Sequence, residues 1–421
     1  MQGIRIFANA AEGGIVVCLG TGADRTEPVP PGGVRVVRTL RKAGSLLVSE
    51  RERTGRSLSL QRESGAGDSS RLVPARGFLR FSLMSSSSRP SKPKSVFLLP
   101  EVHLESIYPL RLREEIAAKT EVVSIPDGFA NWRESGEALR EVELAFSGWG
   151  MPAMDTDFLE CFPSLRHVFY GAGSVRRFYT AEALERGIGV SSAWRANAVP
   201  VAEYAQATIL LSLKHFWRQI RDCKEAREWR RSPTIPGAFR TTVGLLSLGA
   251  IGRLVAGRLA SHDLRVLAYD PFASEEDAAD LGVELVDLET VFRESEVVSV
   301  HTPDLPTTKG LVSGDLLRSL KPGATLINSS RGAVIDEPAL IEVLRYRPDL
   351  QAILDVTATE PIGAESPLWD LPNLILTPHI AGSMGGECAR MGEYMMAELD
   401  RYLAGRPLEH TVTSGMLEVM A

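Results

Sequence analysis

Features that mark secreted, membrane-spanning or metal-binding proteins are scarce in this chain. Its 421 residues include only four cysteines, Cys18, Cys161, Cys223 and Cys388, and no two of them have the close spacing of a metal or redox motif. We therefore expect reduced structural thiols, no metal site and a cytoplasmic location. The richest apolar run, 205–213, is too short to cross a membrane, and the net charge of -6 argues against a nucleic-acid partner.

Residues 1–93 lack a persistent apolar period and mix arginine, serine, glycine and proline. Such a composition predicts a disordered extension. A transit peptide fits poorly, because acidic residues such as Glu12 and Asp24 are scattered through this stretch. The alternative is a mis-assigned start. Met84 precedes a serine run and the first credible strand, 95–100, so residues 1–83 would then lie outside the native protein.

From residue 95 onward, short apolar runs alternate with helical patterns. This alternation predicts an α/β fold with two Rossmann-like, doubly wound parallel-sheet domains and a cleft between them. The first unit covers about 95–198. A long helix predicted over 200–217 then leads into the second unit.

A glycine-rich turn opens the second unit. Residues 241–246 read as a buried strand, and 253–260 as a helix with Leu254, Val255 and Leu259 on its apolar side. The turn between them resembles G-x-G-x-x-G with serine at the first glycine. It contains Ser247, Gly249, Ala250, Ile251 and Gly252. Gly249 would let the backbone approach a pyrophosphate, and Gly252 would let the helix pack on the strand. Alone, such a turn gives weak support for a nucleotide site.

The next strand strengthens this interpretation. Residues 264–270 end in Asp270, about twenty residues past the glycines, where a carboxylate can accept hydrogen bonds from ribose hydroxyls. A 2'-phosphate beside Asp270 would be repelled, so NAD is favoured over NADP as the cofactor. Arg265 lies at the far end of the strand and should point elsewhere.

Three polar motifs follow apolar runs in the C-terminal half, at 324–327, 352–354 and 374–376. Because carboxyl ends of parallel strands meet at one edge, Arg331, Glu360 and His379 should converge. Arg331 can hold a carboxylate through two hydrogen bonds, and His379 can exchange a proton near neutral pH while Glu360 fixes its tautomer. Each residue alone could be a solvated surface residue. Together they predict an acid–base site with an anion clamp.

With these motifs, residues 95–408 resemble the NAD-dependent D-isomer-specific 2-hydroxyacid dehydrogenases. Residues 299–303, 331–337 and 367–379 look like the family's cofactor strand end, arginine motif and histidine motif. The resemblance implies that Asp355 binds the nicotinamide amide and that the loop after residue 170 shares the substrate carboxylate with Arg331. The remaining cofactor residues that it implies are Thr302, Ser329, Ser330 and Gly382; the loop residues are Gly171, Ala172, Gly173 and Ser174.

The chain departs from the family pattern near this loop. The family usually has an aspartate after the second glycine, whereas here Val175 is followed by Arg176 and Arg177. This basic pair could select a doubly acidic or phosphorylated substrate, or form a solvated face, which we favour. Ser247, and Ala250 in place of a frequent arginine, suggest modest cofactor affinity.

The resemblance also implies a domain division. The substrate domain would comprise 94–198 and 382–412, the NAD-binding domain 199–381, and the last helix, 385–403, would return to the substrate domain. A homodimer is expected.

The expected activity is hydride transfer between NAD(H) and C2 of a 2-hydroxy or 2-oxo acid, as in hydroxypyruvate or glyoxylate reductases and phosphoglycerate dehydrogenases. Glu360 argues against formate as the substrate, because formate dehydrogenases, which resemble this site, carry glutamine at that position. The alternative is an NAD-gated protein-binding platform that resembles the family's corepressors.

Overall fold

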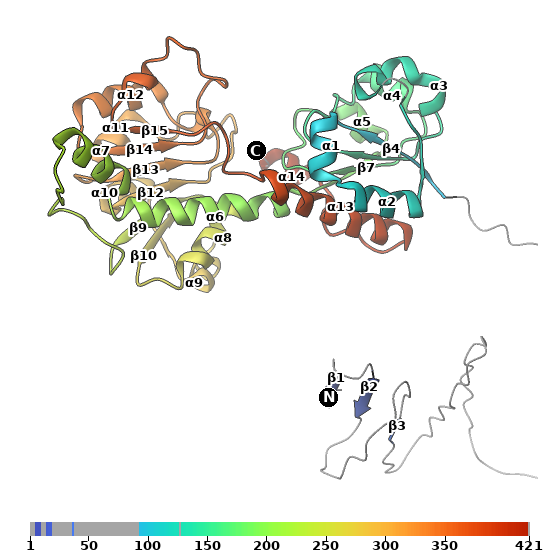
Figure 1. Cartoon of the computed structure of the whole chain (residues 1–421), viewed down its shortest axis with the longest axis horizontal. Helices are drawn as coiled ribbons and strands as arrows, with labels where there is room; N and C mark the ends of the chain where they lie inside the picture. The colour runs from blue at the N-terminus through green and yellow to red at the C-terminus, as the bar shows by residue number, and fades with distance from the viewer. Residues whose placement is uncertain (1–4, 10–13, 19–35, 38–91, 126–127, 420–421) are drawn as a thin grey trace, which may run out of the picture. The chain divides into compact units, whose positions relative to one another are not determined.

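The computed structural model describes residues 5–9, 14–18, 36–37, 92–125 and 128–419 (Figure 1). The chain divides into two compact units, Met1–Ser86 and Ser87–Ala421. In the first unit, β1 (Arg5–Asn9) pairs antiparallel with β2 (Gly14–Cys18), and β3 (Val36–Val37) pairs parallel with β2. The rest of the extension that we expected to be disordered, and the start proposed at Met84, lie outside the described residues.

The second unit contains two parallel sheets, as the sequence predicted. The smaller sheet has five strands in the order β5-β4-β6-β7-β8. Its strands are β4 (Lys94–Leu98), β5 (Glu121–Val122), β6 (Leu144–Ser147), β7 (His167–Tyr170) and β8 (Gly189–Ser192). Its helices are α1 (Glu101–Ile107), α2 (Leu110–Lys119), the 3-10 helix η1 (Phe129–Ser135), α3 (Gly136–Leu139), α4 (Thr156–Cys161) and α5 (Ala181–Glu185).

The larger sheet has seven strands in the order β11-β10-β9-β12-β13-β14-β15, all parallel. Its strands are β9 (Thr242–Leu246), β10 (Arg265–Tyr269), β11 (Glu284–Leu285), β12 (Val297–Val300), β13 (Thr325–Asn328), β14 (Gln351–Leu354) and β15 (Leu374–Leu376). The helices around it are α8 (Ala250–Leu259), α9 (Glu275–Leu281), α10 (Leu288–Glu294), α11 (Gly314–Ser319), η2 (Gly332–Val334), α12 (Glu337–Tyr346) and η3 (Pro367–Asp370). The strand order reverses between β9 and β12, because β10 and β11 continue on one side of β9 and β12 to β15 on the other. The glycine turn after β9 therefore lies at a topological switch point.

The central strands β12, β13 and β14 of the larger sheet are buried on both faces. In β14, Ala352 and Leu354 join a core with α10, α11 and α12, whereas Ile353 joins a core with α8, α9 and the long helix α6 (Trp194–Ser212). Successive side chains of a strand point to opposite faces, so burial of both faces requires the continuous apolar run seen in the sequence.

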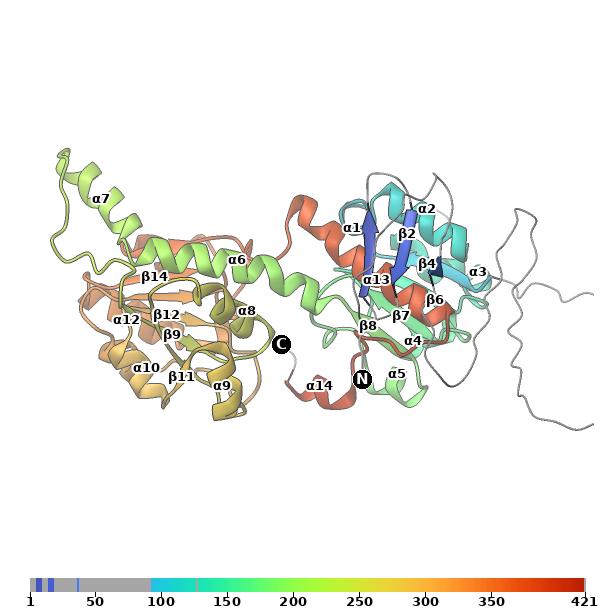
Figure 2. The same cartoon turned by 90° about the horizontal axis from the view of Figure 1, so that it is seen from below.

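The long helix differs from the prediction over 200–217. Helix α6 (Trp194–Ser212) begins six residues earlier and ends before His215, whose φ of 49° breaks the helix ahead of α7 (Phe216–Ala226). The helix was predicted to begin at Pro200, because proline often occupies the first turn of a helix. Here Pro200 lies inside α6. The turn around it is buried at Ala196 and Ala198, and this packing offsets the helical hydrogen bond that proline removes. Figure 2 shows α7 projecting beyond α6.

The C-terminal segment packs against the smaller sheet. After η4 (Gly385–Glu387), α13 (Cys388–Leu403) contacts α1, α2 and β7, and α14 (Ser414–Val419) follows. Gly392 is required in α13, because a Cβ there would lie 2.0 Å from the Ile107 carbonyl oxygen. The sheet's other face packs on α3, α4 and α5.

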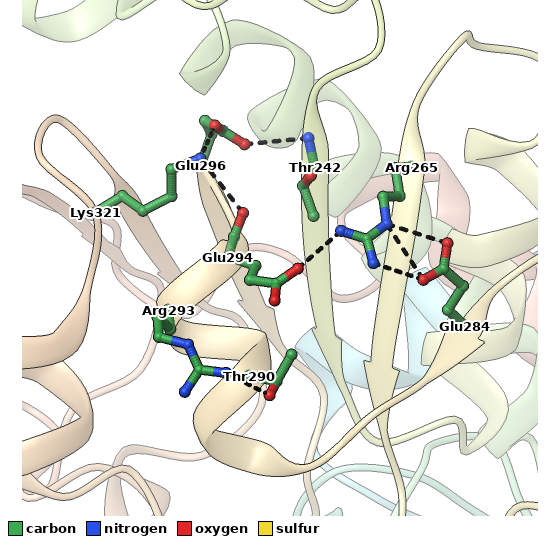
Figure 3. Close-up of polar contacts among 8 residues, drawn as sticks. All are labelled: Thr242, Arg265, Glu284, Thr290, Arg293, Glu294, Glu296 and Lys321. Carbon is green, nitrogen blue, oxygen red and sulfur yellow. Dashed lines mark hydrogen bonds and ion pairs between the residues drawn. The ribbon is translucent and has the colours of Figure 1, made fainter.

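An ion-pair cluster lies where the strands of the larger sheet begin (Figure 3). Arg265, the first residue of β10, bonds to Glu284 at 2.7 Å and to Glu294 at 2.8 Å. Nearby, Lys321 pairs with Glu296, whose carboxylate also accepts the Thr242 N–H. Arg265 is therefore directed away from Asp270, as expected from its position.

Candidate active site

The arginine and histidine motifs, with Asp355 between them, follow three adjacent strands. In the sheet, Asn328 of β13 aligns with Leu354 of β14, which aligns with Leu376 of β15. Arg331, Asp355 and His379 come one to three residues after these aligned positions. The convergence at one sheet edge is the arrangement that the strand order requires.

The central contact of the site joins His379 to Glu360. The imidazole Nδ1 lies 2.8 Å from the Glu360 Oε2 atom, and both side chains are partly exposed, by 49% and 40%. Glu360 is itself placed by the Thr357 N–H, which donates to Oε1 at 3.2 Å. With Nδ1 engaged, His379 leaves Nε2 for a ligand.

The backbone at His379 is strained, because its φ of 55° is in the left-handed region that favours glycine. Hydrogen bonds hold it there. The His379 N–H donates to the Asp355 carbonyl, while the Asp355 carboxylate accepts from the Thr377 hydroxyl at 2.6 Å and from the N–H groups of Ile380 and Ala381 at 2.8 and 2.9 Å. Asp355 therefore fixes the turn that carries the histidine.

Arg331 begins a turn built by Asn328. The Asn328 side chain accepts from Ser330 and donates to the Arg331 carbonyl, and the Arg331 Nη1 donates to the Ser330 carbonyl at 2.7 Å. Burial lowers the pKa of Arg331; the nearby Glu360 carboxylate opposes this shift, and Arg177 adds to it. The guanidinium is thus poorly hydrated and within electrostatic reach of the His379–Glu360 pair, which suits it to hold an anion.

The glycine turn is tighter than the sequence indicated. Helix α8 begins at Ala250 rather than Arg253, and its buried residues are Gly252, Val255, Ala256 and Leu259. The prediction that Leu254 packs inward is wrong, since it is exposed. The register of the helix is set by Gly252, where a Cβ would lie 2.0 Å from the Ser247 carbonyl oxygen.

Ser247 takes a φ of 75°, which explains why glycine is usual at the first position of such a turn. Its hydroxyl compensates by bonding the Thr302 hydroxyl at 3.0 Å. Asp270 supports the same turn, because its carboxylate accepts from the Leu248 N–H at 2.7 Å and from the Phe272 N–H at 2.8 Å.

Ser329 and Ser330 are buried beside Arg331 at the end of β13. The Ser330 hydroxyl donates to the Asn328 side-chain oxygen at 2.8 Å, whereas the Ser329 hydroxyl is buried without a hydrogen-bond partner among the described residues. Gly382 lies close to Asn197, which accepts from the neighbouring Ser383 N–H at 3.0 Å.

The loop expected to lie on the substrate side, 171–174, follows β7. Gly171 packs tightly against Ile107 and Tyr108, and its N–H donates to the Ser147 carbonyl, so this amide is already engaged. In the described part of the chain, the N–H groups of Ala172, Gly173 and Ser174 have no acceptor. These three amides alone suit the role expected of the loop.

The basic pair after this loop is exposed. Arg176 donates to the Asp304 carbonyl at 3.3 Å, and Arg177 lies near enough to Arg331 to lower its pKa. The structure thus places Arg177 near Arg331, although the loop itself makes no hydrogen bond to Arg331 among the residues described.

Two residues of α6 were not assigned to the site from the sequence. Asn197 bonds the segment after His379, and the Tyr204 hydroxyl lies 3.1 Å from that of Thr377. They are seven residues apart, so they share a helix face. That spacing was visible in the sequence, but their partners lie so far along the chain that only the fold shows them.

Two further observations concern metal ions and membranes. Over the described ranges, no cluster of histidine, cysteine and acidic residues could hold a metal ion. Within the same ranges, every helix is too short or too polar to span a bilayer.

Comparisons with known proteins show what this chain is similar to. The sequence model described as D-isomer specific 2-hydroxyacid dehydrogenase, NAD binding domain, matches residues 207–381. D-3-phosphoglycerate dehydrogenase of Archaeoglobus fulgidus is 32% identical over 266 residues, which cover 63% of this chain and 50% of that protein. Glyoxylate reductase of Korarchaeum cryptofilum is 31% identical over 270 residues, covering 63% of this chain and 81% of that protein.

The fold agrees as well. A solved 2-hydroxyacid dehydrogenase from Ketogulonicigenium vulgare superimposes with a TM-score of 0.63 at 26% identity, covering 77% of this chain and 99% of that one. The chain spans about half the length of the phosphoglycerate dehydrogenases that it matches. It belongs to the D-isomer specific 2-hydroxyacid dehydrogenase family.

Proposed function

We propose that this chain is an oxidoreductase that uses NAD(H) to interconvert a 2-oxo acid and its D-2-hydroxy acid. The observation that carries the proposal is the 2.8 Å bond between His379 and Glu360, placed within electrostatic reach of Arg331. An imidazole held by a carboxylate beside an arginine suits proton transfer to an acid substrate.

The residues around the glycine turn fit a dinucleotide. A Cβ built on Gly249 meets no atom within 4 Å, so the N-terminus of α8 is open to a phosphate, and the buried Ser329 hydroxyl is available to a ligand. The chemistry that bound NAD(H) supplies is hydride transfer between its nicotinamide C4 and C2 of the acid. The residues proposed to hold it are Ser247, Gly249, Ala250, Ile251, Gly252, Asp270, Thr302, Ser329, Ser330, Asp355 and Gly382.

The protein's own part in the reaction follows from the site. Arg331 and the amides of 172–174 hold the substrate carboxylate. His379, protonated on both nitrogens, donates its Nε2 proton to the ketone oxygen and becomes neutral. Glu360 accepts from Nδ1 and stabilises the imidazolium before the transfer. In the reverse direction Nε2 accepts the hydroxyl proton. General acid–base help of this kind contributes about 10²- to 10⁴-fold to the rate.

NAD is proposed as the preferred cofactor over NADP. Asp270 presents its carboxylate where the second strand of the dinucleotide fold ends, and it also anchors the glycine turn through Leu248. A 2'-phosphate there would meet like charge. Arg265, the basic residue on the same strand, is engaged by Glu284 and Glu294 at the opposite end.

Two observations support a proposal for the substrate, the names of the relatives and the position of Arg177. The relatives are named for phosphoglycerate and for glyoxylate. Arg177, which makes no hydrogen bond or ion pair with any described residue, lies beside Arg331 and could meet a second negative group. Paired substrates that differ in one anionic group, such as 3-phosphohydroxypyruvate and hydroxypyruvate, distinguish selection by Arg177 from a solvated face.

The test is oxidation of NADH and NADPH by the full chain across such a panel of 2-oxo acids. Turnover with NADH on at least one acid, and less with NADPH, is expected. Tight NADH binding with no turnover on any acid would instead favour the protein-binding platform.

The homodimer expected from the resemblance is also proposed. Helix α7 buries none of its residues and exposes Phe216 and Ile220, which suits contact with a second copy (Figure 2). Light scattering of the full chain tests it: a monomeric mass would refute it. We also propose the two domains expected from the sequence. The substrate domain comprises 94–198 and 382–412, because α13 packs against the smaller sheet, and the NAD-binding domain comprises 199–381.

A further inference from the structure

We propose that Tyr204 is a positioning residue for His379, acting through the Thr377 hydroxyl and the Asp355 carboxylate. The expected effect on turnover rests on the proposed function, whereas the effect on the histidine itself does not. Tyr204 is on α6, 173 residues before Thr377, and it does not touch the acid–base pair.

The Thr377 hydroxyl determines the direction of the hydrogen bonds that join Tyr204 to Asp355. The Thr377 hydroxyl has one proton and donates it to Asp355 Oδ1 at 2.6 Å. Its oxygen can then only accept, so Tyr204, 3.1 Å away, must be the donor. Burial raises the pKa of Tyr204, which keeps that proton in place. The chain therefore runs from Tyr204 to Thr377 to Asp355.

This chain ends at the histidine turn. Asp355 Oδ1 accepts the hydrogen bond from the Thr377 hydroxyl and also accepts from the Ile380 N–H at 2.8 Å. The Asp355 carbonyl accepts from the His379 N–H. These bonds hold His379 at its φ of 55°, a conformation that it would otherwise leave. A weaker hold on Asp355 should therefore move the imidazole relative to Glu360.

Helix α6 holds both ends of this segment. Tyr204 bonds Thr377 before the histidine, and Asn197, two helical turns earlier on the same face, accepts from Ser383 after it. The histidine turn is thus tied to one rigid element at two points. Loss of one tie should misplace His379 without unfolding the strand that precedes it.

The test replaces Tyr204 with phenylalanine, which removes only the hydroxyl. We expect kcat to fall about tenfold with the dissociation constant for NADH unchanged, because small misplacement of a catalytic group costs rate. The imidazole NMR signals of His379, assigned by their loss in His379→Ala, should also shift. The matched control is Tyr179→Phe, which removes a buried hydroxyl bonded to the Ile188 carbonyl at 2.7 Å and should change neither readout.

A second variant guards against misfolding. Thr377→Val breaks the same chain, so it should reproduce both effects, and Tyr204→Phe should add little in that background. If Tyr204→Phe keeps kcat within twofold and the His379 signals unchanged, the proposal is overturned. If the wild-type protein turns over no acid, the proposed function fails, while the NMR signals still decide the role of Tyr204.

Discussion

At the residue scale, two side chains of the candidate site occupy backbone conformations that favour glycine. Ser247 has a φ of 75° and His379 a φ of 55°, and each is held by hydrogen bonds, to Thr302 and to Asp355 respectively. The sequence predicted both residues as part of the site, since motif and spacing identify residue types. It could not predict their strain, because φ is set by partners 55 and 24 residues away, Thr302 and Asp355.

The strain at Ser247 can be measured with a matched pair of variants. Both Ser247→Gly and Ser247→Ala remove the hydroxyl bond to Thr302, but only glycine relaxes the positive φ. We expect Ser247→Gly to be more stable than Ser247→Ala by about 1 kcal/mol in urea unfolding. Equal unfolding midpoints for the two variants would show that the turn is not strained.

At the element scale, the strands were predicted almost to the residue and the helices less well. The strand runs ending at Leu246 and Leu354 are buried on both faces, so their limits are visible as apolar runs. Helix α8 begins three residues earlier than predicted, because the turn closes on Gly252 and no residue type announces that contact. Similarly, α6 extends through Pro200 because its first turns are buried by tertiary packing.

Two glycines of α8 should respond oppositely to alanine. A Cβ on Gly252 would lie 2.0 Å from the Ser247 carbonyl oxygen, so Gly252→Ala must displace the turn and should weaken NADH binding at least tenfold. Gly257 in the same helix is exposed, with no atom within 4 Å of its Cβ position.

Gly257→Ala should therefore leave NADH binding unchanged and raise stability by about 0.5–1 kcal/mol, through helix propensity alone. Fluorescence titration and thermal unfolding measure both variants. Equal NADH affinity in Gly252→Ala and Gly257→Ala would contradict the close approach of helix and turn.

At the scale of the whole molecule, the α/β class and the two parallel sheets were predictable from alternating strand and helix patterns. The contacts that tie distant segments together were not. His167 of β7 lies 3.0 Å from the Ser191 hydroxyl, which donates to Glu398 of α13, 207 residues beyond Ser191. Nothing in the sequence around His167 marks it as buried.

Such buried histidines predict acid sensitivity. Burial lowers the pKa of His167 and of His301 to about 4, below the value of about 6.5 expected when unfolded. Between these values the unfolded chain binds more protons than the folded one. Stability is therefore full above pH 6.5 and declines as pH falls toward 4, by up to about 1.4 kcal/mol per pH unit for each histidine.

The measurement is the urea unfolding free energy between pH 4 and 7 for the wild type and for His167→Gln. The variant should show a shallower decline, because one of the two groups no longer takes up a proton. The control is His262→Gln, at a partly exposed position, which should keep the wild-type slope. A slope unchanged by His167→Gln would contradict burial as the cause.

The most direct test of the central claim compares binding with chemistry in one variant, His379→Ala. Among the described residues the side chain makes one hydrogen bond, to Glu360, and none to the glycine turn, so the dissociation constant for NADH should stay within about twofold. The kcat on the best 2-oxo acid should fall about 10²- to 10⁴-fold, the contribution of a general acid. Unchanged turnover, or an equal loss of NADH binding, would contradict the assignment of His379 as the proton donor.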